Sequence, residues 1–456
     1  MEVNSRPAPP ASPRAFFVSV AVFGVVACAV IGVLFQGILQ TPIDTDEALY
    51  LNTGTAVERW LAADVADLMP RTRSTLTIAP LAPLLGGVSR LLAGLPFGGP
   101  YLFPAGSADP LATAIMPAPE LLLTARLPMV MAGIASTALL AALMWRARGP
   151  ATGIAAAAML IANVTYTTFN QRLLNEAPLL LCTALAYIAA RRASRGTGIG
   201  VCVAAGVLAG LAIVAKHTGV LTVAAAVGLV GLADLAKRLR MRTVIARAAT
   251  LVSAAGFVAI ALNPFVWTNP LTAIGDVIAA RVVETNEQRG FFPTTVLSTP
   301  LERVNGFTWR VFTNGATLGC AQSFDRGVAV DPITNQWRYG AFVPGKLLAK
   351  TPLCQPELAA TPVMRPLTVF NLAWFVAGIC VAMLGAKRDR RRIAGVALGW
   401  GGLFMGATVA LVQFSWFHYY ALPLVFATLI QAVAIGAGAQ KLIELARRRA
   451  GRVGQP

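Results

Sequence analysis

The chain has 456 residues, of which 56% are hydrophobic and only 13% are charged, and its mean hydropathy is +0.66. A soluble chain of this length carries about twice that share of charged residues, so the composition excludes an ordinary soluble protein. The net charge of +18 is typical of a nucleic-acid-binding protein, but the positions of the charges indicate another origin.

Apolar segments long enough to cross about 30 Å of hydrocarbon recur from one end of the chain to the other. They predict an all-α polytopic membrane protein with about ten transmembrane helices. The expected spans are residues 15–38, 125–145, 151–169, 174–190, 197–215, 218–235, 244–266, 366–386, 393–413 and 417–438. No small-residue cleavage site follows the first span, so we expect it to be retained.

The basic residues fall mainly in the segments between spans that share one side of the membrane. With a cytoplasmic N-terminus, the inner segments hold 22 Lys/Arg and 4 Asp/Glu, whereas the outer segments hold 16 of each kind. The excess is therefore a positive-inside bias, which predicts cytoplasmic termini, a multi-pass cell-membrane protein (plasma or inner membrane) and no nucleic-acid partner. The expected regions are a disordered tail (1–14), an N-terminal membrane module (15–267) with an outer loop (39–124), a second outer loop (268–364), C-terminal helices (365–438) and a basic tail (439–456).

Three carboxylates, Asp44, Asp46 and Glu47, lie just after the first span. They are either a solvated helix start or an active-site cluster at the membrane surface. The pattern from Asp46 to Leu61 predicts an amphipathic helix along the membrane, with Tyr50 suited to the headgroup zone. The apolar stretch 76–95 is interrupted by Pro and Gly, which predicts a second surface helix or a re-entrant turn.

Two further polar concentrations lie on the predicted outer face. Arg172 and Glu176 are four residues apart between the third and fourth spans, where one helical turn would join them as a simple ion pair or as groups facing a cavity. Lys216 and His217 join the fifth and sixth spans. A lysine there either snorkels from a helix end or receives phosphate from a lipid headgroup.

The second outer loop has Pro/Gly turns and scattered aromatic residues but no apolar core run, which predicts a small ordered insertion. Its Cys320 and Cys354 favour a disulfide, with free thiols as the alternative. Near its start, Glu284 and its charged neighbours either grip a substrate or are plain surface. In the last outer turn, His418 and Tyr419 belong to an interfacial aromatic belt or face a cavity.

The chain resembles the GT-C class of membrane glycosyltransferases, closest to the branch that holds protein O-mannosyltransferases and lipid A aminoarabinose transferases. The residues that carry the resemblance are, in chain order, Asp46-Glu47 with Tyr50, Arg126-Leu127-Pro128, Arg172 with Glu176-Ala177-Pro178, Gly206 to Gly210 leading to Lys216, and Tyr419 to Pro423. The second outer loop matches no motif of the class. Glu176 stands where this branch more often has Asp.

The resemblance implies transfer of a sugar, with inversion, from a polyprenyl-phosphate-linked donor to a lipid, glycan or protein acceptor at the outer face of the membrane. It implies catalytic roles for Asp46, Glu47 and Glu176, donor phosphate binding by Lys216, Arg172 and His217, and substrate binding by Tyr50, Arg126, His418 and Tyr419. A departing phosphate requires cations, and a hydroxyl acceptor gains from a carboxylate that takes its proton. No cofactor is certain, and Mg²⁺ or Mn²⁺ held by Asp46 and Glu176 stays an open alternative.

A transporter or flippase of lipid-linked sugars would also place carboxylates and cations in a cavity facing the lipid. Transporters usually hold ionisable groups near the bilayer midplane in broken helices, often in repeated halves. The predicted spans are nearly free of charge and show no repeat, which favours the enzyme. A non-catalytic assembly protein is a weaker alternative.

Overall fold

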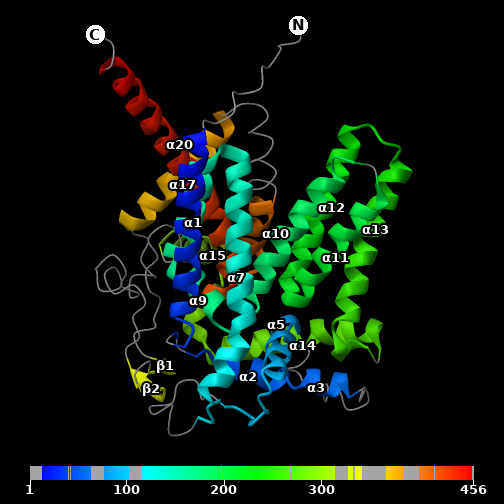
Figure 1. Ribbon diagram of the computed structural model, residues 1–456. Helices are drawn as coiled ribbons and strands as arrows, with labels where there is room; N and C mark the ends of the chain where they lie inside the picture. Colours follow the sequence, from blue (N-terminus) through cyan, green and yellow to red (C-terminus); the bar gives the residue numbers. More distant parts are fainter. Residues whose placement is uncertain are drawn as a thin grey trace.

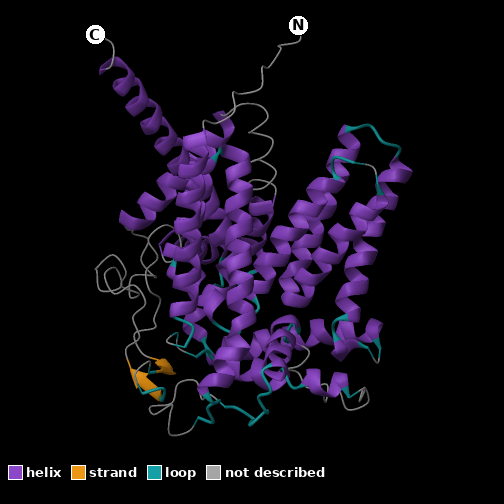
Figure 2. Ribbon diagram, in the orientation of Figure 1, coloured by secondary structure: helices purple, strands orange, loops and turns teal. Residues whose placement is uncertain are grey.

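The computed structural model describes residues 13–39, 41, 43–62, 77–102, 114–196, 198–267, 269–313, 327–331, 334–340, 366–384, 400–414 and 416–453. They fold mainly into α-helices that run side by side as a bundle, with shorter helices gathered at one end (Figure 1). We call this end, where α2, α3 and α5 lie, the α2 end. The two short strands lie at the same end (Figure 2).

The bundle contains α1 (Pro13–Gln36), α7 (Pro119–Arg148), α8 (Pro150–Ala162), α9 (Val164–Gln171), α10 (Glu176–Ala193), α11 (Ile199–Ala215), α12 (Val220–Ala236), α13 (Met241–Ala261), α17 (Pro366–Leu384), α19 (Gly401–Leu411) and α20 (Ala421–Val453). The other helices are α2 (Thr45–Thr53), α3 (Ala56–Leu61), α5 (Leu81–Leu92), α14 (Pro270–Phe291) and α15 (Pro300–Thr308). Short 3₁₀ turns are η1 (His217–Gly219), η2 (Pro264–Val266), η3 (Pro293–Thr295) and η8 (Phe417–Tyr420), and η4 (Trp309–Thr313) is π-helical. Strands β1 (Gly327–Val330) and β2 (Trp337–Gly340) pair antiparallel.

Four helical segments of the described chain are long and apolar enough to cross a membrane, namely α7, His217–Ala236, α13 and His418–Ala446. A fifth is added if α8 and α9 form one bent span. The protein is therefore a helical membrane protein, as predicted. The number of ten spans stays a prediction, since the apolar parts of α1, α11, α17 and α19 that the structure describes are shorter.

The expected third span, 151–169, is not one straight helix. α8 and α9 meet at a 72° bend around Asn163. The Asn163 side chain accepts a hydrogen bond from the backbone N–H of Tyr166 and so caps α9. The sequence did not predict this cap, because Asn163 lies inside a continuous apolar run. The cap ends α8 and begins α9. The bend leaves the polar α9 buried near the α2 end.

The glycines of the Gly206–Gly210 motif have a packing role. A Cβ on Gly206 would lie 2.4 Å from the carbonyl oxygen of Leu251, and one on Gly210 would lie 2.6 Å from that of Ala255. Both close approaches are to α13. Small residues four apart allow two helix backbones to approach closely within a membrane. The motif thereby fixes α11, whose end carries Lys216.

The predicted amphipathic helix Asp46–Leu61 is broken into α2 and α3 at Gly54. At this break, α2 packs so closely on α5 that a Cβ on Gly87 would lie 2.2 Å from the Gly54 carbonyl oxygen. With 12 residues, α5 is about 18 Å long and too short to span a bilayer. Its shortness agrees with the predicted surface helix or re-entrant turn.

Candidate functional site

The first turn of α2 begins at a capping box. The Asp44 side chain accepts a hydrogen bond from the backbone N–H of Asp46, and the Glu47 carboxylate accepts one from the backbone N–H of Asp44 at 2.9 Å. Such reciprocal bonds satisfy backbone N–H groups that a helix start leaves unpaired. Asp44 is therefore the N-cap of α2, in agreement with the helix-start alternative for this residue.

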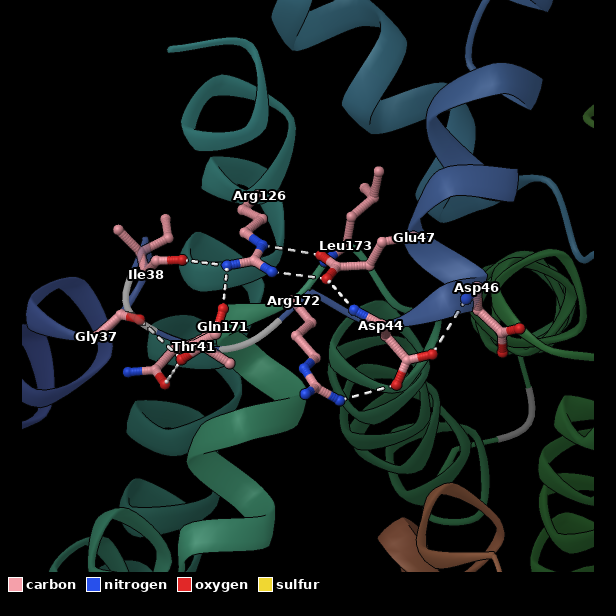
Figure 3. Close-up of polar contacts among 10 residues, drawn as sticks. All are labelled: Gly37, Ile38, Thr41, Asp44, Asp46, Glu47, Arg126, Gln171, Arg172 and Leu173. Carbon is pink, nitrogen blue, oxygen red and sulfur yellow. Dashed lines mark hydrogen bonds and ion pairs between the residues drawn. The ribbon is translucent and has the colours of Figure 1, made fainter. Parts of the chain in front are cut away.

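Glu47 points into the protein core and pairs with Arg126 of α7 (Figure 3). The guanidinium donates to both carboxylate oxygens, at 2.8 and 2.6 Å, and both side chains are fully buried. Glu47 also accepts from the backbone N–H of Leu173 at 2.7 Å, while Arg126 donates to the carbonyls of Ile38 and Thr41. Burial alone would raise the pKa of Glu47, but Arg126 outweighs it and the net pKa is lowered. This pair joins α1, α2, α7 and the α9–α10 loop.

Arg172 does not form the expected pair with Glu176. Its backbone is extended and α10 begins only at Glu176, so the two residues share no helical turn. The Arg172 guanidinium instead donates to Asp44 at 2.8 Å (Figure 3). Arg172 therefore ties the α9–α10 loop to the start of α2.

A cavity of about 560 Å³ opens at the α2 end. Seven of the predicted site residues line it, namely Asp46, Tyr50, Glu176, Lys216, His217, His418 and Tyr419. Asp44 lines it as well, whereas Glu47, Arg126 and Arg172 do not. The structure thus gathers these residues from four segments that are far apart in the sequence, at positions 46–50, 176, 216–217 and 418–419.

Asp46 points away from the Glu47–Arg126 pair (Figure 3). Asp46 is accessible to water in the cavity, and the protein atoms that form the cavity surround it. Burial raises the pKa of Asp46 to about 7, the negative charges of Asp44 and Glu176 add to the rise, and Lys216 opposes it. A carboxyl with this pKa changes its protonation state near neutral pH, as a general base does.

Lys216 is the centre of a second group of polar contacts in the cavity. Its ammonium donates to Glu176 at 2.6 Å and to the His418 carbonyl at 3.3 Å. It also lies 5.3 Å from the centre of the Tyr419 ring, within the range of a cation–π contact. The ammonium therefore joins α10 to η8 and remains at the cavity surface.

Tyr50 of α2 lines the same cavity, close enough to Asp46 and Glu176 for both charges to act on it. Its hydroxyl accepts a hydrogen bond from the Asn175 amide at 2.9 Å, and burial together with Asp46 and Glu176 raises its pKa well above its usual value. Tyr50 therefore stays protonated and offers a hydroxyl to the cavity.

Three further charged residues line the cavity, and of these only Glu284 was considered from the sequence, as a substrate-gripping or a surface residue. Arg281 and Glu284 of α14 form an ion pair at 2.9 Å. Arg310 in η4 also lines the cavity, and within the described part of the chain its Nε has no hydrogen-bond partner. Burial lowers the pKa of Arg310 to about 10, so this cation stays charged at neutral pH. Arg281 lies on α14, a helix that the sequence did not predict because the second outer loop lacks an apolar run.

The residues predicted to hold a metal do not form a closed site. Asp46 and Glu176 both line the cavity, but the Glu176 carboxylate is engaged by Lys216. No group of three or more His, Cys, Asp or Glu side chains in the described ranges is placed to share a metal ion. Cys320 and Cys354, the predicted disulfide, lie outside the described residues.

Several solved structures of GT-C glycosyltransferases resemble the chain in the arrangement of its helices, and they belong to the class that its motifs resemble. The archaeal oligosaccharyltransferase AglB from Archaeoglobus fulgidus, in complex with an inhibitory peptide and a dolichol-phosphate, matches with a TM-score of 0.45 and 12% identity over 98% of this chain and 53% of that one. ArnT from Cupriavidus metallidurans bound to undecaprenyl phosphate has a TM-score of 0.36 and 15% identity, covering 91% and 76%.

A protein O-mannosyltransferase complex from S. cerevisiae, bound to its sugar donor, matches with a TM-score of 0.39 and 14% identity over 55% of this chain and 33% of that one. The chain thus spans only a third to a half of the length of this protein and of AglB. No family model and no curated protein matches the chain. Because the TM-scores are below 0.5, no residue of the cavity is matched to a residue of these proteins.

Proposed function

We propose that the protein is a glycosyltransferase that moves a sugar from a polyprenyl-phosphate-linked donor to a lipid, glycan or protein acceptor. The observation that carries this proposal is the composition of the cavity at the α2 end. It combines a carboxyl whose pKa is about 7 with the cations Lys216, Arg281 and Arg310 in a helical membrane protein. We further propose that this end faces outward, with both termini cytoplasmic and about ten spans, as the positive-inside bias indicates.

The cations suit a phosphate leaving group. Arg310 is charged, and its Nε has no partner among the described residues. Lys216 also lines the cavity, where its ammonium donates to Glu176. Cations placed where negative charge develops stabilise the transition state most. Apolar lining residues such as Leu49 and Ile78 suit the first isoprene units of the donor.

In the proposed reaction, Asp46 is the general base. The acceptor hydroxyl gives its proton to the Asp46 carboxylate while its oxygen attacks the anomeric carbon of the sugar. The bond from this carbon to the phosphate oxygen breaks on the opposite face, and the phosphate keeps the electron pair next to the cations. Attack opposite the leaving group inverts the configuration of the sugar. A base is most effective when its pKa lies near the working pH.

Glu47, Arg126 and Arg172 take a different role in this proposal from the one expected of them. None of them lines the cavity, and each is committed to a buried ion pair or hydrogen bond around the start of α2. We therefore assign them to positioning. Glu47 and Arg126 hold the first turn of α2, and Arg172 holds its N-cap.

The position of the cavity supports an enzyme over a transporter or flippase. Asp46 lies on the short helix α2 of 9 residues, which cannot cross a bilayer. Glu176 and Lys216 lie where α10 begins and where α11 ends. A transporter would hold such groups near the midplane.

The test uses purified protein in liposomes and a panel of polyprenyl-phosphate sugars, with released polyprenyl phosphate measured by mass spectrometry. Asp46→Asn is expected to abolish release while the protein inserts normally. Asp276→Asn is the matched control, because Asp276 is exposed on α14 and does not line the cavity. Full release by Asp46→Asn would refute the assignment. Mass spectrometry of glycolipids and glycoproteins from a deletion strain would identify the sugar and the acceptor.

A further inference from the structure

A second cavity, of about 520 Å³, lies between α7 and α10 at the end of the bundle opposite the α2 end. Arg126 and Arg146 are 20 residues apart on α7, which corresponds to about 30 Å along the helix. This is about the thickness of the hydrocarbon core. α7 and α10 thus run from the surroundings of the candidate active site, where Arg126 holds Glu47 and Glu176 lines the cavity, to the second cavity.

The walls of the second cavity have two chemically distinct parts. One part is an apolar strip made by the side chains Leu139, Ala142, Leu143, Ala147 and Ile188. The other part is made by Arg146, Arg191, Arg192 and Arg195. None of the described residues that line it is Asp or Glu.

Two other basic residues at this end of the bundle, Arg247 and Lys237, share one carboxylate. Arg247 is fully buried and donates to Asp234 at 2.7 Å, and Lys237 lies 4.0 Å from the same carboxylate. The chain thus supplies its own carboxylate to the buried cation of α13. Among the arginines of the second cavity, Arg191 donates to the Tyr187 hydroxyl at 3.3 Å.

Two general effects favour arginines at this position without any ligand. Cations are stabilised near helix C-termini, where α7 and α10 end, and positive charge gathers on the inner side of membrane proteins. Both effects are satisfied by arginines that spread into solvent, and Arg146, Arg192 and Arg195 are each exposed. Neither effect requires that the arginines of two helices converge on one hollow with an apolar strip running into the membrane.

We propose that this cavity binds an anionic phospholipid, with the phosphate against the arginines and the first part of an acyl chain along the apolar strip. Arginine suits this role because its planar guanidinium binds phosphate oxygens with two parallel hydrogen bonds. Basic pockets between membrane helices are known to recognise lipid headgroups in this way. The site is separate from the candidate active site and does not depend on the proposed reaction.

The test is native mass spectrometry of the full-length protein released from nanodiscs that contain phosphatidylglycerol and phosphatidylcholine in equal amounts. The wild type is expected to retain phosphatidylglycerol preferentially. The double variant Arg192→Gln/Arg195→Gln is expected to retain about tenfold less of it. Arg240→Gln/Arg242→Gln removes the same charge from residues that are equally exposed but do not line the cavity, and is expected to behave like the wild type.

A variant that keeps every charge separates a site from general attraction. Ala142→Phe fills the apolar strip and is expected to reduce retained phosphatidylglycerol as the arginine variants do. The proposal is overturned if the wild type shows no preference between the two lipids, if both arginine pairs lose lipid equally, or if Ala142→Phe retains lipid like the wild type. Competition by millimolar inorganic phosphate that removes all bound lipid would also overturn it, since it would show a free-anion site.

Discussion

Asp46 and Glu47 are consecutive residues of α2 whose side chains face different surroundings. Glu47 points into the core, where Arg126 binds it at 2.6 and 2.8 Å, and Asp46 lines the cavity (Figure 3). Successive residues of a helix point about 100° apart, so fixing one of them fixes the other. The buried pair therefore determines the direction of the carboxylate to which we assign the chemistry.

Arg126→Leu is expected to destabilise the protein by about 3–5 kcal/mol, because it leaves the Glu47 carboxylate buried without its cation. The double variant Arg126→Leu/Glu47→Gln removes both charges and is expected to recover part of this loss. Thermal unfolding in detergent, followed by tryptophan fluorescence, measures both. Equal loss in the single and double variants would contradict the structural role of the pair.

The gathering of the cavity residues followed from the sequence to a large extent. Apolar runs of membrane length place their ends in two planes, so Glu176, Lys216 and His418 were expected at one boundary together with Asp46. The structure brings all four to one cavity. The helical membrane fold and the hairpin of α11 and α12 followed from the same pattern.

What the sequence did not reveal depends on local geometry and on partners distant in the chain. The inward direction of Glu47 depends on Arg126, 79 residues later. Arg172 pairs with Asp44 because the backbone before α10 is extended, which the spacing of charges does not encode. Arg281 and Arg310 lie in elements whose composition lacks an apolar pattern, so nothing marked them as cavity residues.

The activity is expected to depend on pH through Asp46. A general base acts when deprotonated, and burial raises the pKa of Asp46 to about 7. The value of kcat/KM should therefore fall about tenfold per pH unit below pH 7 and level off above it. A profile that stays flat between pH 5 and 8 would argue against Asp46 as the base.

Glu176→Gln is expected to shift this acidic limb to lower pH. The substitution removes a negative charge that raises the pKa of Asp46, and it frees Lys216, whose charge lowers it. The remaining activity of the variant is measured as kcat/KM across the same pH range. Glu287→Gln is the control, since Glu287 is exposed on α14 and does not line the cavity. An identical limb in Glu176→Gln and wild type would show that the two carboxylates do not interact.

Arg310→Ala is expected to lower kcat/KM about 10- to 100-fold, as loss of one charged hydrogen bond to phosphate would. The expected cause is weaker donor binding, so KM for the donor should rise and Arg310→Lys should restore part of it. Arg289→Ala removes the same charge from an exposed residue of α14 that bonds Gln413 outside the cavity, and should leave the kinetics unchanged. Equal effects at Arg289 and Arg310 would indicate general electrostatic attraction instead.

Gly87→Ala tests whether the packing of α2 on α5 positions Asp46. The added Cβ would lie 2.2 Å from the Gly54 carbonyl oxygen, and because this atom belongs to the backbone, α2 must move as a unit. We expect a loss of about 1–3 kcal/mol in stability and a lower kcat with little change in donor KM. Gly228→Ala in α12 meets no atom within 4 Å and is expected to be neutral or slightly stabilising. The kcat of Gly87→Ala is expected to fall because a displaced Asp46 carboxylate no longer reaches the acceptor hydroxyl. A wild-type kcat in Gly87→Ala would therefore show that the position of Asp46 does not depend on this contact.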